Sequence, residues 1–256
     1  MTTAIEAIRE VRKTQETRKK PLAIILAGHN GSGKSTMWRR SLADELRIPL
    51  VNADRIMLSI LPEPASDGAL PVWAQTLRDT DEGWMRVAQQ GVQAFVGHAM
   101  NAQVPFAMET VFSHWQVRED GTVESKIDLI RDLQKAGYFV FLIFVGLVNV
   151  ELSIARVATR VSEHGHDVPE VRLRHRFPRT QQAISQALQV ADAALLADNS
   201  RTPSEAFTVC RVQIESREIF DLRANDASPP SVISRWLSIV SPRPGVSPSL
   251  RAGEAK

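Results

Sequence analysis

Short apolar runs alternate along the chain with longer segments in which apolar residues recur at helical spacing. A fully apolar run of four to eight residues is typical of a strand buried on both faces of a sheet. We predict strands at 22–27, 48–51, 104–110, 138–145 and 193–198. Helical periodicity predicts helices at 4–17, 33–46, 78–101, 123–136, 149–162 and 169–188. This alternation predicts an α/β fold with a mostly parallel sheet flanked by helices.

Other segments lack this periodicity. Residues 61–72 (LPEPASDGALPV) carry three prolines and are predicted to form a loop. Two short strands near 206–213 and 216–221 follow the last helix-strand unit as a hairpin-like pair. Beyond about residue 224 the chain is rich in Pro, Ser and Ala, and we expect a short helix near 231–239 and then disorder. The predicted organisation is an N-terminal helix with a basic linker (1–20), one domain (21–222) and a Pro/Ser-rich tail (223–256).

Composition limits the functional classes. The 256 residues include 31 basic and 29 acidic side chains, and this net charge of +2 gives no support to nucleic-acid binding. No apolar run approaches the ~18 residues of a membrane span, so we expect no membrane partner. The single cysteine, Cys210, lies in an apolar run and is predicted to be a buried strand residue. One cysteine excludes an internal disulfide, which is typical of a cytoplasmic protein.

Residues 28–36 (GHNGSGKST) match the phosphate-loop pattern G-x-x-x-x-G-K-[ST]. An apolar strand precedes the match and a helical segment follows it, which is the context that the motif requires. The alternative is a chance match on a glycine-rich turn. We predict a P-loop NTPase-type sheet in which this loop binds ATP, with these cofactor-binding residues: Gly28, His29, Asn30, Gly31, Ser32, Gly33, Lys34, Ser35 and Thr36.

The chemistry of the loop follows from its residue types. Glycines allow backbone N–H groups to converge on a polyphosphate, and the start of the next helix adds further N–H groups and its positive dipole end. Lys34 is expected to reach the β- and γ-phosphates, and the hydroxyl of Ser35 is expected to bind Mg²⁺.

Polar residues at the strand ends are further candidates, because ligands of parallel sheets bind at the carboxyl ends of the strands. Asp54 follows the second strand, which lies beside the loop strand if the order is simple. It is predicted to be the catalytic base that accepts the proton of an attacking hydroxyl, or else an N-cap. Glu109 and Thr110 end the third strand. They are predicted to bind the acceptor or to support Mg²⁺ through water, the alternative being an ordinary polar strand end.

Two helices carry many arginines. Arg156 and Arg160 share a face of the helix at 149–162, and the helix at 169–188 carries Arg172, Arg174, Arg176 and Arg179. Two basic helices joined by SEHGHDVP predict an arginine-bearing helical lid that stabilises the charge of a transferred phosphoryl group. The alternative is a solvated basic face. Arg160 and Arg176 are the predicted catalytic arginines.

Absent motifs narrow the class of phosphate-loop protein. The sequence contains no N-K-x-D guanine-reading motif, no L-S-G-G-Q signature and no apolar strand that ends in D-E. A GTPase, a transporter ATPase and a motor ATPase are therefore not favoured.

The ordered segments LAGHNGSGKST, VNADRI, METVFSH, RVATRVSEHGHDVPE, RHRFPR and ADNS resemble the zeta toxin family of P-loop kinases, and its compact bacterial branch most closely. The resemblance covers about residues 20–200. It implies that Lys34 and Ser35 serve the nucleotide and Mg²⁺, that Asp54 is the catalytic base and that Glu109 contacts the substrate. Arg160 matches one phosphate-contacting arginine, and Arg174 and Arg176 compete for the other. Zeta toxins phosphorylate the 3′-hydroxyl of UDP-N-acetylglucosamine, and a small antitoxin usually blocks their nucleotide site.

The function predicted from these observations is an ATP- and Mg²⁺-dependent kinase that phosphorylates a hydroxyl of a small molecule such as a sugar nucleotide. An ATPase or nucleotide-dependent switch that acts on a protein partner is the alternative. A binding module that kept the loop without catalysis and a nucleic-acid kinase are the weaker readings. An antitoxin protein is a further expected partner.

Overall fold

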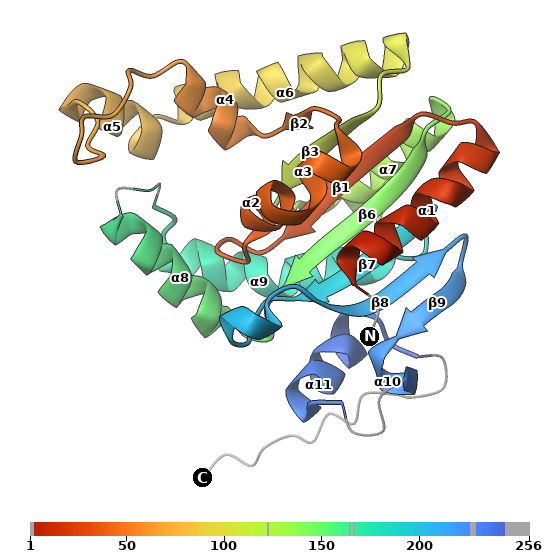
Figure 1. The fold of residues 1–256 in the computed structure, drawn as a ribbon. Helices are drawn as coiled ribbons and strands as arrows, with labels where there is room; N and C mark the ends of the chain where they lie inside the picture. Colours follow the sequence, from red (N-terminus) through yellow and green to blue (C-terminus); the bar gives the residue numbers. More distant parts are fainter. Residues whose placement is uncertain (1–2, 122, 164, 166, 226–228, 244–256) are drawn as a thin grey trace.

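A seven-stranded sheet forms the centre of the protein in this computed structural model, which describes residues 3–121, 123–163, 165, 167–225 and 229–243. Its strands are ordered β2-β3-β1-β6-β7-β8-β9 (Figure 1). Strands β2, β3, β1, β6 and β7 run parallel, and β8 and β9 are antiparallel additions at one edge. Their bounds are β1 Leu22–Gly28, β2 Leu50–Val51, β3 Phe106–Thr110, β6 Phe139–Gly146, β7 Ala193–Asp198, β8 Thr208–Ile214 and β9 Arg217–Asp221. The predicted α/β class with a mostly parallel sheet is confirmed.

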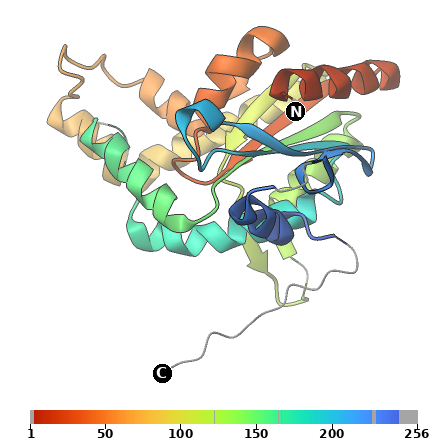
Figure 2. The same ribbon diagram turned by 60° about the horizontal axis from the view of Figure 1, so that its bottom comes forward.

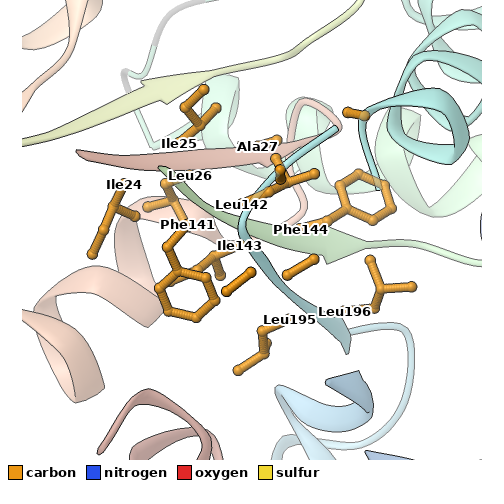
Figure 3. Packing of buried hydrophobic residues seen from close by; sticks show 14 of the residues in the cluster. Ile24, Ile25, Leu26, Ala27, Phe141, Leu142, Ile143, Phe144, Leu195 and Leu196 are labelled. Carbon is orange, nitrogen blue, oxygen red and sulfur yellow. The ribbon is translucent and has the colours of Figure 1, made fainter. Parts of the chain in front are cut away.

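The three central strands are buried along their whole length. Every residue of β1, β6 and β7 is buried, because helices cover both faces of the sheet. Figure 3 shows side chains from these strands packed together, among them Ile24, Phe141 and Leu195. Cys210 of β8 is also fully buried, as predicted. This rigid layer holds the loop that follows β1.

Two helical layers enclose the sheet (Figures 1 and 2). One contains α1 (Ala4–Arg18) and a continuous helical run formed by α2 (Lys34–Met37), η1 (Trp38–Leu42) and α3 (Ala43–Leu46). The other contains α7 (Lys126–Lys135), α9 (Glu170–Ala187) and α11 (Ser231–Val240). The middle of the predicted helix at 33–46 is a π-helical turn, a feature often found beside functional sites.

The terminal helices belong to the same core as the domain between them. α1 buries Ile8 and Val11, and α11 buries Trp236 against Gly146 at the end of β6. The range 21–222 therefore leaves out two helices that share its core. The predicted helix near 231–239 is present, and the disorder predicted after it falls on 244–256, outside the described residues.

A helical arm lies between β2 and β3 in the sequence. It consists of α4 (Ala53–Ser59), α5 (Val72–Thr80) and α6 (Glu82–Ala102), and Figure 1 shows these helices together beyond the β2 edge of the sheet. α4 packs on α6. The predicted helix at 78–101 is wrong in its start, because Asp81 is extended and its side chain accepts a hydrogen bond from Trp84 N, which caps a new helix. The loop predicted at 61–72 ends where α5 begins.

Smaller elements complete the chain: β4 (Trp115–Val117), β5 (Val123–Ser125), α8 (Val150–Ser162), η2 (Pro203–Glu205) and α10 (Leu222–Asn225). The helix predicted at 123–136 is wrong in its first residues, because Val123–Ser125 pair with β4 as an antiparallel hairpin. The Ser125 side chain then caps α7. In the part of the chain that the structure describes, no helix has both the length and the apolar character to cross a bilayer.

The expectation that β2 lies directly beside the loop strand β1 is wrong. β3 lies between β1 and β2, so the segment that carries Asp54 is one strand further from the phosphate loop than a simple order implies. Periodicity along the chain does not encode lateral strand order, since only the crossover connections decide it.

Candidate functional site

The carboxyl ends of four neighbouring strands meet at one edge of the sheet. Thr110 of β3 pairs with Ala27 of β1, Gly28 pairs with Val145 of β6, and Gly146 pairs with Asp198 of β7. The phosphate loop therefore begins in the middle of this edge. This is the position at which ligands bind in open α/β sheets.

Two glycines of the loop have left-handed backbone angles. Gly31 has φ +70° and Gly33 has φ +90°. Both are also tightly packed: a Cβ on Gly33 would lie 2.6 Å from Asn199 Nδ2, and one on Gly31 would lie 3.0 Å from the Cβ of Arg156. A side chain at either place would strain the backbone and displace a neighbour. The loop conformation therefore requires glycine at both positions.

Two side chains from distant elements hold the loop in place. Ser153 Oγ of α8 donates a hydrogen bond to Asn30 O at 2.7 Å, and Asn199 Nδ2 donates one to Ser32 O at 2.8 Å. The backbone N–H of Asn199 donates to Gly146 O at 3.1 Å. Sequence reasoning placed Asn199 only in a turn and in a family segment. The sequence signal that could have identified Asn199 as a support of the loop was its position directly after a buried strand, at the edge of the sheet where ligands bind.

Lys34 lies inside the loop and is 8% exposed. Its Nζ donates to Gly28 O at 3.0 Å and to His29 O at 2.9 Å, and Glu109 Oε1 is 4.0 Å away. Burial lowers the pKa of the Lys34 ammonium below its usual value. The negative charges of Glu109 and Asp54 oppose this shift, and Arg160 adds to it. Two carboxylates and an arginine are thus within electrostatic reach of the loop lysine.

Ser35 and Glu109 are in direct contact. Ser35 Oγ is 2.9 Å from Glu109 Oε1 and 3.0 Å from Oε2, so the hydroxyl donates to this carboxylate. A hydroxyl beside a carboxylate supplies hard oxygen ligands, which fit Mg²⁺. Thr110 is engaged locally, because its Oγ1 accepts a hydrogen bond from Phe112 N at 3.3 Å.

Asp54 is the second residue of α4 and is exposed. The N-cap role belongs to Asn52, whose Oδ1 accepts from Asp54 N at 2.8 Å and from Arg55 N at 3.3 Å. The alternative that Asp54 serves as the N-cap is therefore wrong. Its charge acts on both Lys34 and Arg176. Asp54 is thus a carboxylate at the site with no capping duty.

The arginines of the two helices separate into different groups. Burial lowers the pKa of Arg176, as does Arg172 nearby, and Asp54 opposes the shift. Arg160 is close enough to Lys34 to lower the pKa of that ammonium. Arg174 instead pairs with Glu170 at 2.8 Å and with Glu151 of α8 at 3.1 Å. The charge of Arg160 is therefore within electrostatic reach of Lys34, and that of Arg176 is within reach of Asp54. Arg174 instead links α9 to α8.

The side chain of His29 does not line the loop. It is 2% exposed, and its ring stacks on Phe177 of α9 with centroids 3.9 Å apart. Burial, with a smaller contribution from Lys34, lowers the pKa of His29 to about 3. Only the backbone of this residue is available to a phosphate.

Protein side chains alone do not form a metal cage. Among the described residues, no group of three or more His, Cys, Asp or Glu side chains is placed to hold a metal ion. His114 pairs with Glu124 at 3.1 Å, away from the loop, and His164 and His166 lie outside the described residues. A divalent cation at Ser35 thus depends on oxygens of a bound nucleotide and water.

A pocket of about 260 Å³ lies beside the site, between the arm and α9. Arg172 lines it and is one helical turn before Arg176, whose pKa its charge lowers. The lining of the pocket carries charges of both signs. The lining residues are Asp79, Thr80, Asp81, Glu82, Met85, Arg86, Gln89 and Arg172.

Comparison with known proteins identifies similar folds. No protein-family model matches the chain. An uncharacterised protein of Haemophilus influenzae is 28% identical over 155 residues, which cover 60% of this chain and 91% of the relative. Crystal structures of the AvrRxo1-ORF1:AvrRxo1-ORF2 complex match with 16% identity, covering 94% of this chain and 71% of theirs. Their TM-scores are 0.58 for the structure with sulphate ions and 0.57 for the one with ATP.

A chain of the PezAT chromosomal toxin-antitoxin system of Streptococcus pneumoniae is also similar. It matches with a TM-score of 0.51 and 14% identity, covering 93% of this chain and 88% of that one. These likenesses show that the chain shares its fold with chains of these toxin-antitoxin and AvrRxo1 structures. At such identities they establish the fold and not the reaction.

Proposed function

We propose that the protein is an ATP- and Mg²⁺-dependent kinase that transfers the γ-phosphate to a hydroxyl of a small molecule. The observation that carries the proposal is the meeting of Lys34, Ser35, Glu109 and Asp54 at one sheet edge, facing Arg160 and Arg176. Folding alone does not require this set of charges in one place. Phosphoryl transfer requires a phosphate cradle, a proton acceptor and cations around the transferred group.

Each residue takes a distinct part in the reaction. Backbone N–H groups of residues 28–36 and the ammonium of Lys34 bind the β- and γ-phosphates. Asp54 accepts the proton of the acceptor hydroxyl as its oxygen attacks the γ-phosphorus. Arg160 and Arg176 stabilise the negative charge on the transferred group. The bond from the γ-phosphorus to the ADP oxygen breaks, so the products are ADP and the phosphorylated acceptor.

Magnesium fits the hydroxyl and carboxylate oxygens of Ser35 and Glu109. When bound, it neutralises charge on the β- and γ-phosphates. Glu109 keeps the Ser35 hydroxyl oriented through the hydrogen bonds described above.

The polar pocket beside Arg172 is the proposed acceptor site. Its Arg172 acts electrostatically on Arg176, on which the charge of Asp54 also acts. The mixed charges of the lining suit a polar molecule that carries both hydroxyls and an anionic group. UDP-N-acetylglucosamine or a similar sugar nucleotide has these features, and the sequence resemblance to zeta toxins supports it. Arg86→Gln should raise the KM for the acceptor about tenfold through loss of a charged hydrogen bond. The KM for ATP should stay unchanged.

The first experiment combines the protein with MgCl₂, ATP and UDP-N-acetylglucosamine and follows the products by mass spectrometry. A sugar nucleotide heavier by one phosphoryl group is the expected product. Asp54→Asn should reduce its rate on the order of 10²–10⁴-fold, because this change removes the base. Asp44→Asn, on α3, is the matched control and should have the wild-type rate.

The outcomes separate the candidate reactions. Free phosphate without a phosphorylated sugar nucleotide would favour an ATPase that acts on a protein partner. If neither product forms, the acceptor is sought in a metabolite extract. An unchanged rate in Asp54→Asn would refute the assigned base.

We also propose a protein partner of the antitoxin kind that controls this kinase in the cytoplasm. The similar chains come from the AvrRxo1-ORF1:AvrRxo1-ORF2 complex and from a toxin-antitoxin system, which supports this proposal. Co-expression of the kinase with the product of an adjacent reading frame, followed by co-purification, tests it. Growth arrest on expression of the kinase alone, relieved by the partner, is the expected result.

A further inference from the structure

The imidazole of His29 lies beneath the phosphate loop, between the sheet and α9. Its ring is nearly parallel to that of Phe177, with 13° between the planes, and it meets Phe144 of β6 edge-on with centroids 5.6 Å apart. Its Nε2 is buried without a hydrogen-bond partner. A ring placed in this way offers packing surface and does not bind phosphate.

The backbone of the same residue touches the loop lysine. His29 O accepts a hydrogen bond from Lys34 Nζ at 2.9 Å. On the other side, Phe177 directly follows Arg176 in α9, and Arg176 is the arginine on which the charge of Asp54 acts. His29 therefore contacts Lys34 through its backbone and contacts the sequence neighbour of Arg176 through its ring. The proposed reaction places both of these cations around one phosphoryl group.

α9 also contacts the segment that follows β3, close to this stack. Thr180 Oγ1 donates to Val111 O, just after β3, at 3.3 Å. This hydrogen bond holds the part of α9 beyond Phe177. The stack on His29 therefore joins the phosphate loop to α9 one residue after Arg176 and five residues after Arg172, which lines the pocket.

We propose that His29 is a positioning residue that sets the place of Arg176 relative to Lys34 through its stack on Phe177. This inference rests on the proposed kinase function. A misplacement of about 1 Å at a reacting group costs on the order of 10²-fold in rate, so a stack that fixes one arginine has a measurable effect on transfer.

The role requires a flat ring and not a proton. Burial lowers the pKa of His29 to about 3, so the ring is neutral at pH 7. A phenylalanine at this position keeps the stacking surface, whereas a leucine removes it. The two substitutions separate positioning from acid-base chemistry.

The test measures transfer kinetics in His29→Leu, Phe177→Leu and His29→Phe. We expect kcat to fall on the order of 10²-fold in both leucine variants, with the KM for ATP nearly constant. His29→Phe should recover most of the loss and keep the wild-type pH profile. Phe144→Leu is the control, because it removes the other ring contact of His29 and leaves the Phe177 ring in place. A loss in Phe144→Leu equal to that in His29→Leu would overturn the proposal.

A second readout needs no acceptor. Arg176 positioned at the γ-phosphate gives a preference for ATP over ADP, measured by calorimetry. Arg176→Ala and His29→Leu should each reduce this preference about tenfold, and the double variant should be no worse than Arg176→Ala alone. The positioning role would be overturned if the losses of the two single variants multiplied in the double variant. It would also be overturned if Arg176→Ala left the preference for ATP over ADP unchanged. If the wild type prefers ATP but makes no phosphorylated product, the kinase proposal fails and this one stands.

Discussion

The phosphate loop and the helical arm of residues 53–102 are built by opposite means. The loop follows a strand with no exposed residue, and hydrogen bonds from α8 and from Asn199 hold it. The arm exposes large apolar side chains: Leu58, Ile60, Val72, Trp73 and Val87 are 46–81% exposed. A fixed loop suits a ligand part that never changes, the triphosphate. An open arm suits an acceptor or partner that differs from one protein to the next.

The largest effect in this comparison between loop and arm is expected from replacing Lys34, the cation of the loop. Lys34→Met should reduce phosphoryl transfer on the order of 10²–10³-fold, because it removes a charge that stabilises the transferred group. Steady-state kinetics measure the effect. The exposed Lys13→Met is the matched control and should have the wild-type rate. A loss below tenfold in Lys34→Met would contradict the assigned role.

The support of the loop by a distant residue is tested next. Asn199→Ala leaves Ser32 O without its donor, so the free energy of unfolding should fall by about 1–3 kcal/mol. Urea titration of the free energy of unfolding measures this loss. Asn101→Ala, on the exposed surface of α6, should change stability by less than about 0.5 kcal/mol. Equal losses in the two variants would show that the loop is no more firmly held than the arm.

Acidification tests how the burial of the His29 ring affects the free energy of unfolding. The pKa of His29 is about 3 when folded, against a usual value of 6.5, so the unfolded chain binds the extra proton. The stability contributed by the neutral ring is complete above pH 6.5 and is lost as the pH falls toward 3. The slope is about 1.4 kcal/mol per pH unit, and the loss between pH 6.5 and 5 is about 2 kcal/mol.

Urea titrations at pH 7, 6 and 5 reveal this contribution. His29→Phe should lose less stability on acidification than the wild type, by the amounts given above. His114→Phe, at an exposed position, should follow the wild-type curve. Parallel curves for wild type and His29→Phe would mean that the buried ring accepts a proton in the folded protein.

The smallest effect is expected on the arm. Trp73→Ser should change the free energy of unfolding by less than about 0.5 kcal/mol, since this side chain is 58% exposed. Trp236→Ala, at a buried position against Gly146, should cost about 3–5 kcal/mol. Urea titration compares the two. A large loss in Trp73→Ser would show that the arm has a packing role of its own.

The same contrast explains what the sequence predicts. Buried strands and the phosphate loop carry strong local signals, so β1, β6, β7 and the Gly-Lys-Ser spacing could be identified along the chain. The arm could not: the break at Asp81 is a single capping residue, and α5 begins within a segment that three prolines mark as a loop. Strand order depends on crossovers, which no local pattern records.

Candidate site residues show a similar limit. Lys34, Ser35, Asp54 and Glu109 were selected from motif and strand-end position, and Arg160 and Arg176 from two basic helices. The structure brings Lys34, Ser35 and Glu109 into contact, with the charges of Asp54 and Arg160 within electrostatic reach of Lys34. The capping role of Asn52 and the hydrogen bond from Asn199 were not predicted, because both depend on three-dimensional contacts. The stack of His29 on Phe177 joins residues far apart in the chain. Each lies in a segment that the sequence analysis singled out, but neither segment indicates that the two rings meet.

The hydrogen bond between Asn199 and Ser32 spans 167 positions of the chain. During synthesis the loop leaves the ribosome early, and its support arrives only when β7 has emerged. At about 5–20 residues per second, this delay is on the order of ten to thirty seconds. The nascent chain therefore completes the support of this loop late. A truncated product that ends before residue 199 carries the loop motif and the hydrogen bond from Ser153, but lacks the one from Asn199.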